Sequence, residues 1–282
     1  MVTKITIMNM KTKFFFFLAL VLTFLGTQKL NAQNTFVDLG LPSGTLWATC
    51  NVGADTPEGY GTFFAWGETS KKNQYNWGNY KYCDGANDTY TKYCTNGEYG
   101  YNGFADGLTE LLPEDDAATA NWGKEWQMPS KAQFEELIND KYTLIEKTTL
   151  NGVNGRMITS KSNGHSIFLP SSGLVLGSSV LYSLTHGYYW SRSLDASSNK
   201  VIQVCFRDGY FDLESDYRDI GMCVRPVRVQ EAHTISDIPN GWKVNGSTTS
   251  GTYQAKGGDV LHFTPKNIPA GKRVKSIKVV KK

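Results

Sequence analysis

Histidine is scarce in this chain, and the common motifs of metal binding and nucleophilic catalysis are missing. The four histidines stand alone, with no HExxH pair and no Cys/His cluster at metal-ligand spacing. There is no GxSxG nucleophile elbow and no glycine-rich phosphate loop. Glu114-Asp115-Asp116 resembles a cation site, but such a run is more typical of a solvated helix start. We therefore expect no catalysis, no cofactor and no metal.

The chain also lacks a surplus of charge of one sign. Its 282 residues carry a formal net charge of +3. Residues 1–32 hold four lysines and no acids, residues 33–228 hold 16 Lys+Arg against 23 Asp+Glu, and residues 229–282 hold 9 against 3. The basic balance comes from the two ends, so it gives no argument for nucleic acid as a partner. The polarity predicts two modules after the first 32 residues.

Only one long hydrophobic run is present, at residues 14–26. Lys11 and Lys13 precede it, and the small residue Ala32 follows it at a suitable distance for cleavage. This pattern predicts a signal peptide over residues 1–32, with the mature protein starting near Gln33. The run is too short for a good membrane span, so we expect a secreted or cell-surface protein and not an integral membrane protein.

Cysteine is present in an odd number, five. Export makes disulfides feasible, and two pairs are plausible from the sequence: Cys83 with Cys94, and Cys205 with Cys223. Cys50 is then left over. The alternative is that all five are free and buried, as small apolar residues often are.

The most informative stretch is residues 187–228, which predicts three strands at residues 201–207, 210–214 and 221–228. Acids and a tyrosine fall on even positions of the middle strand, and Phe211 and Leu213 fall on odd ones. Because alternate side chains of a strand point to opposite faces, one face should be buried and the other should carry an exposed polar row. That row consists of Asp208, Tyr210, Asp212, Glu214 and Asp216. It favours a binding surface, with an ordinary solvated strand face as the alternative.

The remaining pattern is that of an α+β protein. A hairpin is expected at residues 36–49, a short helix at 115–121, a helix capped by Ser130, and strands at 152–160 and 166–169. Residues 69–107 show no helical period and predict a long loop of a kind that is often functional. Four aromatic residues in apolar runs are expected to form the core: Trp47, Trp66, Trp126 and Phe168.

Residues 229–282 predict a small basic all-β module. Its four expected strands cover residues 242–244, 252–255, 260–264 and 274–280, divided by Gly and Asn turns. At this size such a module is marginal alone and would dock on the acidic domain or on a partner.

Several ordered motifs between residues 35 and 228 resemble the secreted family named for the Fibrobacter succinogenes major paralogous domain. They read FVDLGLPSGTLWATCNVG at 36–53, FAWGE at 64–68, DAA at 116–118, WQMPS at 126–130, FLP at 168–170, YWS at 189–191 and VRPV at 224–227. The resemblance implies a C-type-lectin-like fold, related to the formylglycine-generating-enzyme type, in which the first and last strands pair.

The resemblance also implies binding in the segment between the Trp-Ser motif and the Arg-Pro-Val strand, which related diversity-generating proteins vary. The residues that it assigns to ligand binding here are Trp190, Ser191, Arg192, Asp208, Tyr210, Asp212, Glu214, Asp216, Tyr217 and Arg218. Two family activities are not implied. The close cysteine pair of sulfatase-activating enzymes is missing, and so are the calcium motifs of sugar-binding lectins.

The sequence therefore predicts a signal peptide (1–32), a C-type-lectin-like domain (33–228) and a small basic β module (229–282). The expected function is non-catalytic binding of an extracellular protein or glycan. A structural surface or adhesin subunit is one alternative, and an enzyme of the formylglycine-generating type is the other.

Overall fold

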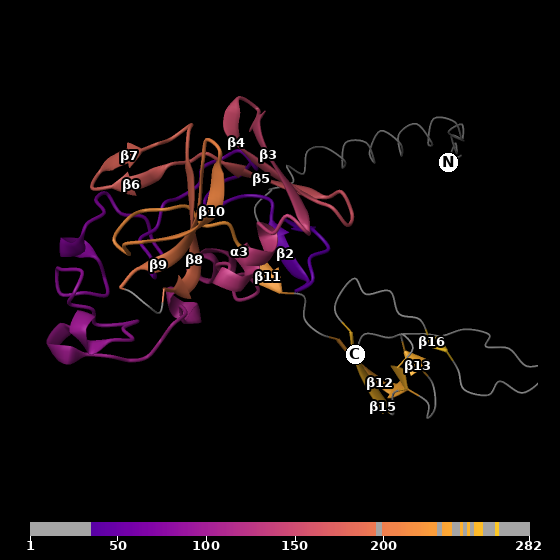
Figure 1. Cartoon of the computed structure of the whole chain (residues 1–282). Helices are drawn as coiled ribbons and strands as arrows, with labels where there is room; N and C mark the ends of the chain where they lie inside the picture. The colour runs from indigo at the N-terminus through magenta and orange to yellow at the C-terminus, as the bar shows by residue number, and fades with distance from the viewer. Residues whose placement is uncertain are drawn as a thin grey trace, which may run out of the picture.

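Strands make up most of the regular structure, and helices are few and short (Figure 1). The computed structural model describes residues 35–195 and 199–229, together with five short strands between residues 233 and 264. The strands form several small sheets of two or three members each. The predicted α+β class is thus confirmed in its general form.

One sheet joins the two ends of the segment from residue 35 to residue 229. It contains β1 (Phe36–Asp38), β2 (Thr45–Ala48) and β11 (Val227–Val229) in the order β1-β2-β11. The predicted first hairpin is confirmed, but the expected pairing of the first strand with the last is wrong, because β2 lies between them. All four residues of β2 are buried, whereas β1 begins with Phe36, which is 46% exposed. An inner position, with partners on both edges, suits the strand that is buried throughout.

Both α-helices of the described residues start at side-chain caps. Asp116 caps α2 (Ala117–Trp122), and Ser130 caps α3 (Lys131–Leu137) in a reciprocal capping box with Gln133. Phe134 and Leu137 are fully buried on one side of α3, and the Phe134 ring packs 5.5 Å from that of Trp47. Both predicted helices are therefore present.

A second sheet has the order β3-β4-β5, with β3 at Thr143–Leu150, β4 at Val153–Ser160 and β5 at Ser166–Pro170. Asn151 and Gly152 make the turn between β3 and β4 with φ of 47° and 84°, the left-handed conformation that a tight hairpin requires. The sequence predicted β4 and β5 but not β3. Half of the residues of β3 are exposed, Leu144 among them, so the strand has no regular alternation of buried apolar and exposed polar residues, and its pairing with β4 defines it.

The third sheet carries the predicted binding strand. It contains β8 (Gly187–Leu194), β9 (Val201–Arg207) and β10 (Tyr210–Asp216) in the order β10-β9-β8. The predicted third strand, at residues 221–228, is largely absent, and only its last two residues lie in a strand, β11. Residues 221–223 make isolated bridges, one of them between Cys223 and Tyr189 of β8, before the chain enters β11. The acidic strand is therefore an edge strand and is not flanked by two cysteine-bearing strands.

Residues 69–107 form the expected long loop, without strands. It contains three 3-10 turns, η1 (Trp77–Asn79), η2 (Gly97–Tyr99) and η3 (Tyr101–Gly103), and η4 (Pro113–Asp115) follows it. The sequence did not predict the hairpin of β6 (Leu174–Leu176) and β7 (Ser179–Leu181). Figure 1 shows this hairpin at one side of the molecule.

Two hydrophobic clusters lie on opposite faces of the β8–β9–β10 sheet. Trp190 and Cys205 belong to the first cluster, together with aromatic residues of the long loop. Tyr189, Val204 and Phe206 belong to the second, together with α3 and β5. The prediction that Trp47, Trp66, Trp126 and Phe168 are core residues is confirmed, with exposures of 0%, 0%, 4% and 2%.

The segment predicted to be a basic β module contains β12 (His233–Ile238), β13 (Lys243–Val244), β14 (Ser247–Thr248), β15 (Gly251–Ala255) and β16 (Phe263–Thr264). β12 pairs with β15, and β13 pairs with both β14 and β16. Three of the four expected strands coincide with β13, β15 and β16. The fourth, at residues 274–280, lies outside the described residues.

Candidate ligand-binding face

The side chains of β10 alternate between the two faces of the sheet, as the sequence predicts. Phe211 stacks on Phe206 with ring centroids 5.2 Å apart and planes 4° from parallel. Phe211 and Leu213 both pack against the second cluster. Phe211 is half-buried rather than buried, because β10 lies at the edge of its sheet.

The predicted acidic row is exposed only in part. Asp208 and Asp212 are exposed, as expected. The expectation is wrong for the other three members of the row, which are half-buried: Tyr210, Glu214 and Asp216. The reason is that loops cover the same face of the sheet where it continues onto β9 and β8, so that Cys205 and Trp190 are fully buried there.

Two of the acids form ion pairs within the domain. Asp208 accepts a hydrogen bond from Lys147 of β3 at 2.9 Å. Glu214 pairs with Arg207 of the neighbouring strand at 3.1 Å. The row is therefore less available to a cationic ligand than its sequence suggests.

The other two acids bind the backbone of their own strand. Asp212 accepts a hydrogen bond from the N–H of Leu213 at 2.7 Å, and Asp216 accepts one from the N–H of Tyr217 at 2.8 Å. An edge strand presents unpaired N–H groups that invite other strands, and charged side chains on the edge oppose such pairing. Asp212 and Asp216 thus protect this edge.

Trp190 and Ser191 are part of the framework. Both are fully buried. The Trp190 indole donates to the Phe64 carbonyl at 2.9 Å, and the Ser191 hydroxyl donates to the Ile202 carbonyl at 2.6 Å. Their predicted role as ligand contacts is wrong in this structure, because neither side chain reaches the surface.

Arg218 is also internal, with 1% exposure. Its guanidinium carbon lies 3.7 Å from the Tyr90 ring centroid, and its Nε donates to the Asn199 carbonyl at 3.1 Å. The cation is held by an aromatic face and carbonyl oxygens of its own chain. The expectation of a ligand contact at Arg218 is therefore wrong as well.

The two remaining predicted residues are partly exposed at different places. Arg192 forms an ion pair with Glu110 at 3.0 Å. Tyr217 packs edge-on to Trp77 of the long loop at 5.8 Å, and Lys200 lies 4.8 Å above its ring. Tyr217 thus belongs to the seam between β10 and the long loop.

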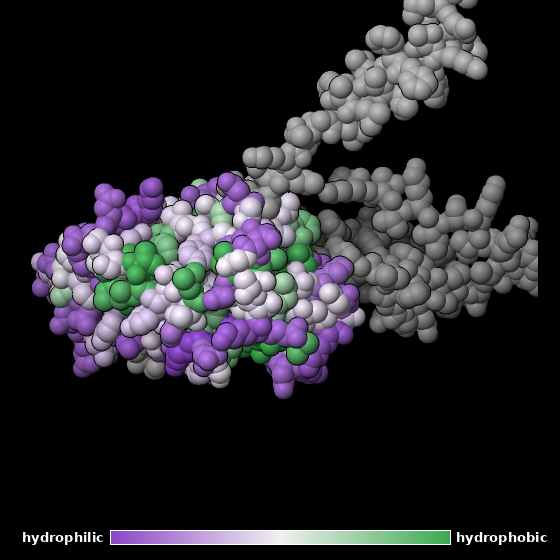
Figure 2. Space-filling model, turned by 90° about the horizontal axis from the view of Figure 1, so that it is seen from above, coloured by the Kyte–Doolittle hydropathy of each residue, from purple (hydrophilic) through white to green (hydrophobic). Residues whose placement is uncertain are grey.

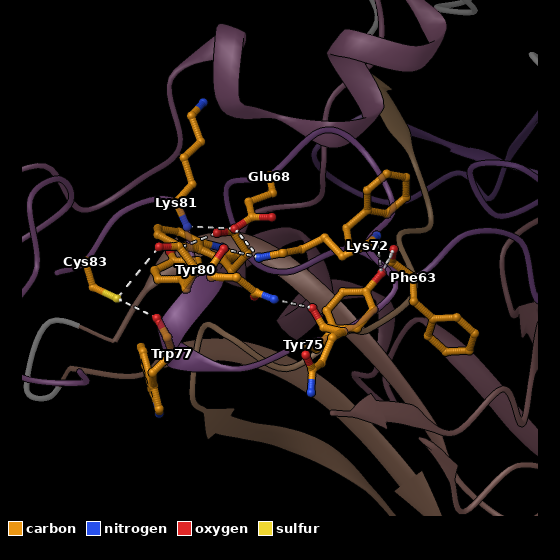
Figure 3. Close-up of polar contacts among 12 residues, drawn as sticks. Phe63, Glu68, Lys72, Tyr75, Trp77, Tyr80, Lys81 and Cys83 are labelled. Carbon is orange, nitrogen blue, oxygen red and sulfur yellow. Dashed lines mark hydrogen bonds and ion pairs between the residues drawn. The ribbon is translucent and has the colours of Figure 1, made fainter. Parts of the chain in front are cut away.

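The start of the long loop is fixed by a polar cluster around Glu68 (Figure 3). One oxygen of Glu68 accepts from Lys72 Nζ at 2.9 Å and from the backbone N–H of Lys81 at 2.8 Å. The Tyr75 hydroxyl donates to the Phe63 carbonyl at 2.6 Å. These groups satisfy one another, so the cluster stabilises the loop rather than offering a ligand site.

The acidic run at 114–116 is structural. Asp115 accepts hydrogen bonds from the hydroxyls of Tyr82 and Tyr93, and from Lys92 Nζ at 2.6 Å. Burial alone would raise the pKa of the Asp115 carboxyl, but these bonds hold that pKa below its usual value. Asp116 is the cap of α2. Within the described residues, no group of His, Cys, Asp and Glu side chains is arranged to hold a metal ion.

All five cysteines are free, so both predicted disulfides are wrong in this structure. Cys205 lies in the first hydrophobic cluster and Cys223 in the second. Burial raises the pKa of Cys205 to about 11 and that of Cys223 to about 12. Thiols with such values stay protonated and are poor nucleophiles.

The structure brings together an aromatic group that the sequence analysis missed. Tyr182, His186 and Tyr188 follow the β6–β7 hairpin. The His186 ring lies 5.1 Å from that of Tyr182 and stacks at 6.0 Å, within 5° of parallel, on that of Tyr188. Tyr182 is 56% exposed and Tyr188 is buried, so the rings form a ledge that rises from the sheet to solvent.

The backbone fixes this ledge. Tyr182 and Leu184 have φ of 60° and 70°, the left-handed region that bulky residues seldom adopt. The N–H of Leu184 donates to the Ser171 carbonyl at 2.8 Å, and the N–H of His186 donates to the Tyr182 carbonyl at 3.0 Å. Strain of this kind persists only where surrounding bonds enforce it, and it is common at ligand-binding sites.

The charged end of β9–β10 adjoins the ledge, because Tyr188 pairs with Cys205 and Arg207 donates to the sulfur of Cys205 at 3.3 Å. Arg207 lies over the Tyr210 ring at 4.1 Å while it pairs with Glu214. Burial lowers the pKa of His186, and the charge of Arg207 lowers it further. Tyr188 also feels the charges of Arg207 and Glu214, in addition to the burial that raises its pKa. The two groups therefore share one electrostatic environment.

We call this surface the aromatic face. Its residues are Tyr182, His186, Tyr188, Arg207, Tyr210 and Glu214. The sequence signal for it was the aromatic-rich run at 182–190. The chain turns back after the β6–β7 hairpin and brings these rings together. The face combines apolar rings with fixed hydrogen-bonding groups, an arrangement suited to binding a ligand.

The described residues contain no helix that is both long and apolar enough to cross a bilayer. The comparisons with family models, with curated proteins and with solved structures found no match for this chain.

Proposed function

We propose that this chain is an exported, non-catalytic binding protein whose residues 33–228 adopt a C-type-lectin-like fold. Support comes from the sheet that brings the last strand to the first hairpin, although β11 pairs with β2 and not with β1. Further support is that the Trp-Ser and Arg-Pro-Val motifs serve as framework, with Trp190 and Arg225 fully buried.

The observation that carries the proposal is the aromatic face. A half-exposed tyrosine in a strained, hydrogen-bonded loop stands beside a stacked ring pair and an Arg–Glu pair. Tyrosine and arginine give large contact area and directed hydrogen bonds at low conformational cost, and they are enriched at binding hot spots. The ligand is an extracellular protein or a glycan.

The rival function is an enzyme of the formylglycine-generating type. That chemistry needs reactive thiols close together. The two C-terminal cysteines lie instead in separate clusters on opposite faces of the β8–β9–β10 sheet, and burial raises the pKa of both. This placement favours binding over catalysis.

The test is a glycan and protein array probed with the exported chain, residues 33–282, followed by titration of each hit against variants of the aromatic face. The proposal predicts at least one ligand whose binding Tyr182→Ala weakens. Hits that bind wild type and Tyr182→Ala equally would exclude this face as the site.

A further inference from the structure

One buried side chain on the floor of the β8–β9–β10 sheet has no hydrogen-bond partner. Gln203 of β9 is 1% exposed, and neither the nitrogen nor the oxygen of its amide is hydrogen-bonded to any of the described residues. Buried polar groups in native proteins are nearly always paired, because an unpaired one loses its bonds to water without replacing them. The amide of Gln203 is therefore suited to a partner from outside the chain.

The register of the sheet places Gln203 next to the aromatic face. Cys205 and Arg207 follow it on the same side of β9, since alternate residues of a strand share a face. Tyr188 pairs with Cys205, and Tyr210 pairs with Arg207, so the row that contains Gln203 is the next one along the strands. The unpaired amide thus lies at the inner end of the aromatic face.

The neighbours of Gln203 in its own row are already engaged. The register places Trp190 on one side of it and Glu214 on the other. The Trp190 indole donates to the Phe64 carbonyl at 2.9 Å, and Glu214 pairs with Arg207 at 3.1 Å. Neither cross-strand neighbour satisfies the amide.

We propose that Gln203 gives the aromatic face its specificity by binding the acetamido group of an N-acetylated sugar. This specificity rests on the proposed binding function and narrows the ligand to a glycan. The amide of Gln203 donates through its nitrogen and accepts through its oxygen. An acetamido group matches both, because its carbonyl and its N–H lie side by side. Its methyl group meets Cys205 and Trp190, which are fully buried members of the first hydrophobic cluster.

The ligand reaches the amide from the side of Glu214. Trp190, on the other side, is fully buried, whereas the side chain of Glu214 is 33% exposed. Its partner Arg207 is 41% exposed, and ion pairs this open to water contribute little to stability. Glu214 can therefore turn outward at small cost, which opens the amide toward the aromatic face.

The aromatic ledge provides a place for the sugar rings. Tyr188, in the row next to Gln203, is its buried end, and Tyr182 is its exposed end. Leu184, which is 55% exposed, adds apolar surface, and Figure 2 shows hydrophobic surface at the side of the molecule where Figure 1 places the β6–β7 hairpin. Aromatic rings beside hydrogen-bonding groups suit a sugar, which is apolar on its ring faces and polar at its rim.

Paired glycan probes test this specificity. The two members of each pair differ only in an acetamido group against a hydroxyl: N-acetylglucosamine with glucose, and N-acetylgalactosamine with galactose, each displayed on a polymer carrier. Residues 33–282 should bind at least one acetamido probe about tenfold or more tightly than its hydroxyl counterpart, because the counterpart leaves a buried amide unpaired.

Gln203→Leu should abolish this preference and leave binding of the hydroxyl probe unchanged. The ratio of the two affinities is the readout, so it does not depend on how much of the variant is folded. The variant should unfold at the same or a higher urea concentration than wild type, because it replaces an unpaired amide by an apolar group. Gln74→Leu is the matched control: Gln74 is exposed in the long loop, and its replacement should keep the preference.

The acetamido assignment is overturned if no acetamido probe binds, if hydroxyl counterparts bind equally well, or if Gln203→Leu keeps the preference. A lower urea midpoint for Gln203→Leu would also overturn it, because the amide would then serve the fold. The proposed function would survive each of these results if Tyr182→Ala still weakened binding of another array ligand, such as a protein.

Discussion

Arg225 Nε donates a hydrogen bond of 2.9 Å to Asn51 Oδ1, and both residues are fully buried. The same guanidinium donates to the carbonyls of Ala48, Thr49 and Phe168 at 2.9–3.1 Å. One cation thus ties the end of β2 to β5 and to the approach to β11. Burial lowers the pKa of Arg225 from its usual high value, yet the group stays charged.

Arg225→Met should destabilise the folded chain by about 3–5 kcal/mol, because four oxygen acceptors each lose the hydrogen bond that Arg225 donates. Arg225→Lys should also be destabilising, because one ammonium group cannot reach acceptors spread around a planar fork. Urea denaturation measures both. Arg228→Ala is the control: its side chain is 31% exposed in a surface pair with Glu125, and it should cost about 1 kcal/mol or less. A stable Arg225→Lys would show that the fork geometry is unimportant.

Stability should depend on pH through Asp219, which is 5% exposed. Burial, with a further contribution from the nearby charge of Asp216, raises the pKa of this carboxyl to about 6. In the unfolded chain the value is about 3.9, so the folded state holds the proton more tightly. The free energy of unfolding should therefore fall as pH rises from about 4 to about 6 and stay level above.

Asp219→Asn should remove this fall. At pH 7 the variant should be more stable than wild type by about 1–3 kcal/mol, and at pH 4 the two should be equal. Urea titrations at both pH values supply the comparison. A constant difference between the two proteins at both pH values would mean that Asp219 does not titrate in this window.

Binding should depend on the aromatic face and not on the acids at the strand edge. For a ligand found on the array, Tyr182→Ala and Tyr210→Ala should each weaken binding tenfold or more, since hot-spot aromatics typically contribute about 2 kcal/mol or more. Asp212→Ala should have a smaller effect, because this carboxylate bonds its own strand. Titration calorimetry with each variant gives the ranking.

Tyr101→Ala is the matched control for these variants, because Tyr101 is a 44% exposed tyrosine in η3. It should bind as wild type does. Loss of binding in Tyr101→Ala together with unchanged binding in Tyr182→Ala would move the site to the long loop.

The thiols should be free but protected. All five cysteines are unpaired, and four are buried. A chromogenic disulfide reagent should react slowly with the folded exported chain and should titrate five thiols after denaturation without reductant. Cys83, which is half-buried, should react first. A yield of one or three thiols would restore the disulfide pairs that the spacing suggests.

The sequence by itself determined the local elements, and it determined which side chains of β10 lie on the apolar face and which on the polar face. The Ser130 cap, the first hairpin, the aromatic core and the alternation of Phe211 and Leu213 with acids follow from rules that act over a few residues. Such rules predict which face of a strand is apolar.

Only the tertiary structure decided which polar face is open. The long loop covers the sheet at Trp190 and Cys205, while β10 lies at its edge. Trp190 and Arg218 are aromatic or charged, yet they are buried, because carbonyls and rings from distant segments satisfy them. The aromatic face joins residues 182–188 to residues 207–214 through the return of a hairpin that the sequence did not predict. Long-range packing fixes these relationships, and spacing along the chain does not encode them.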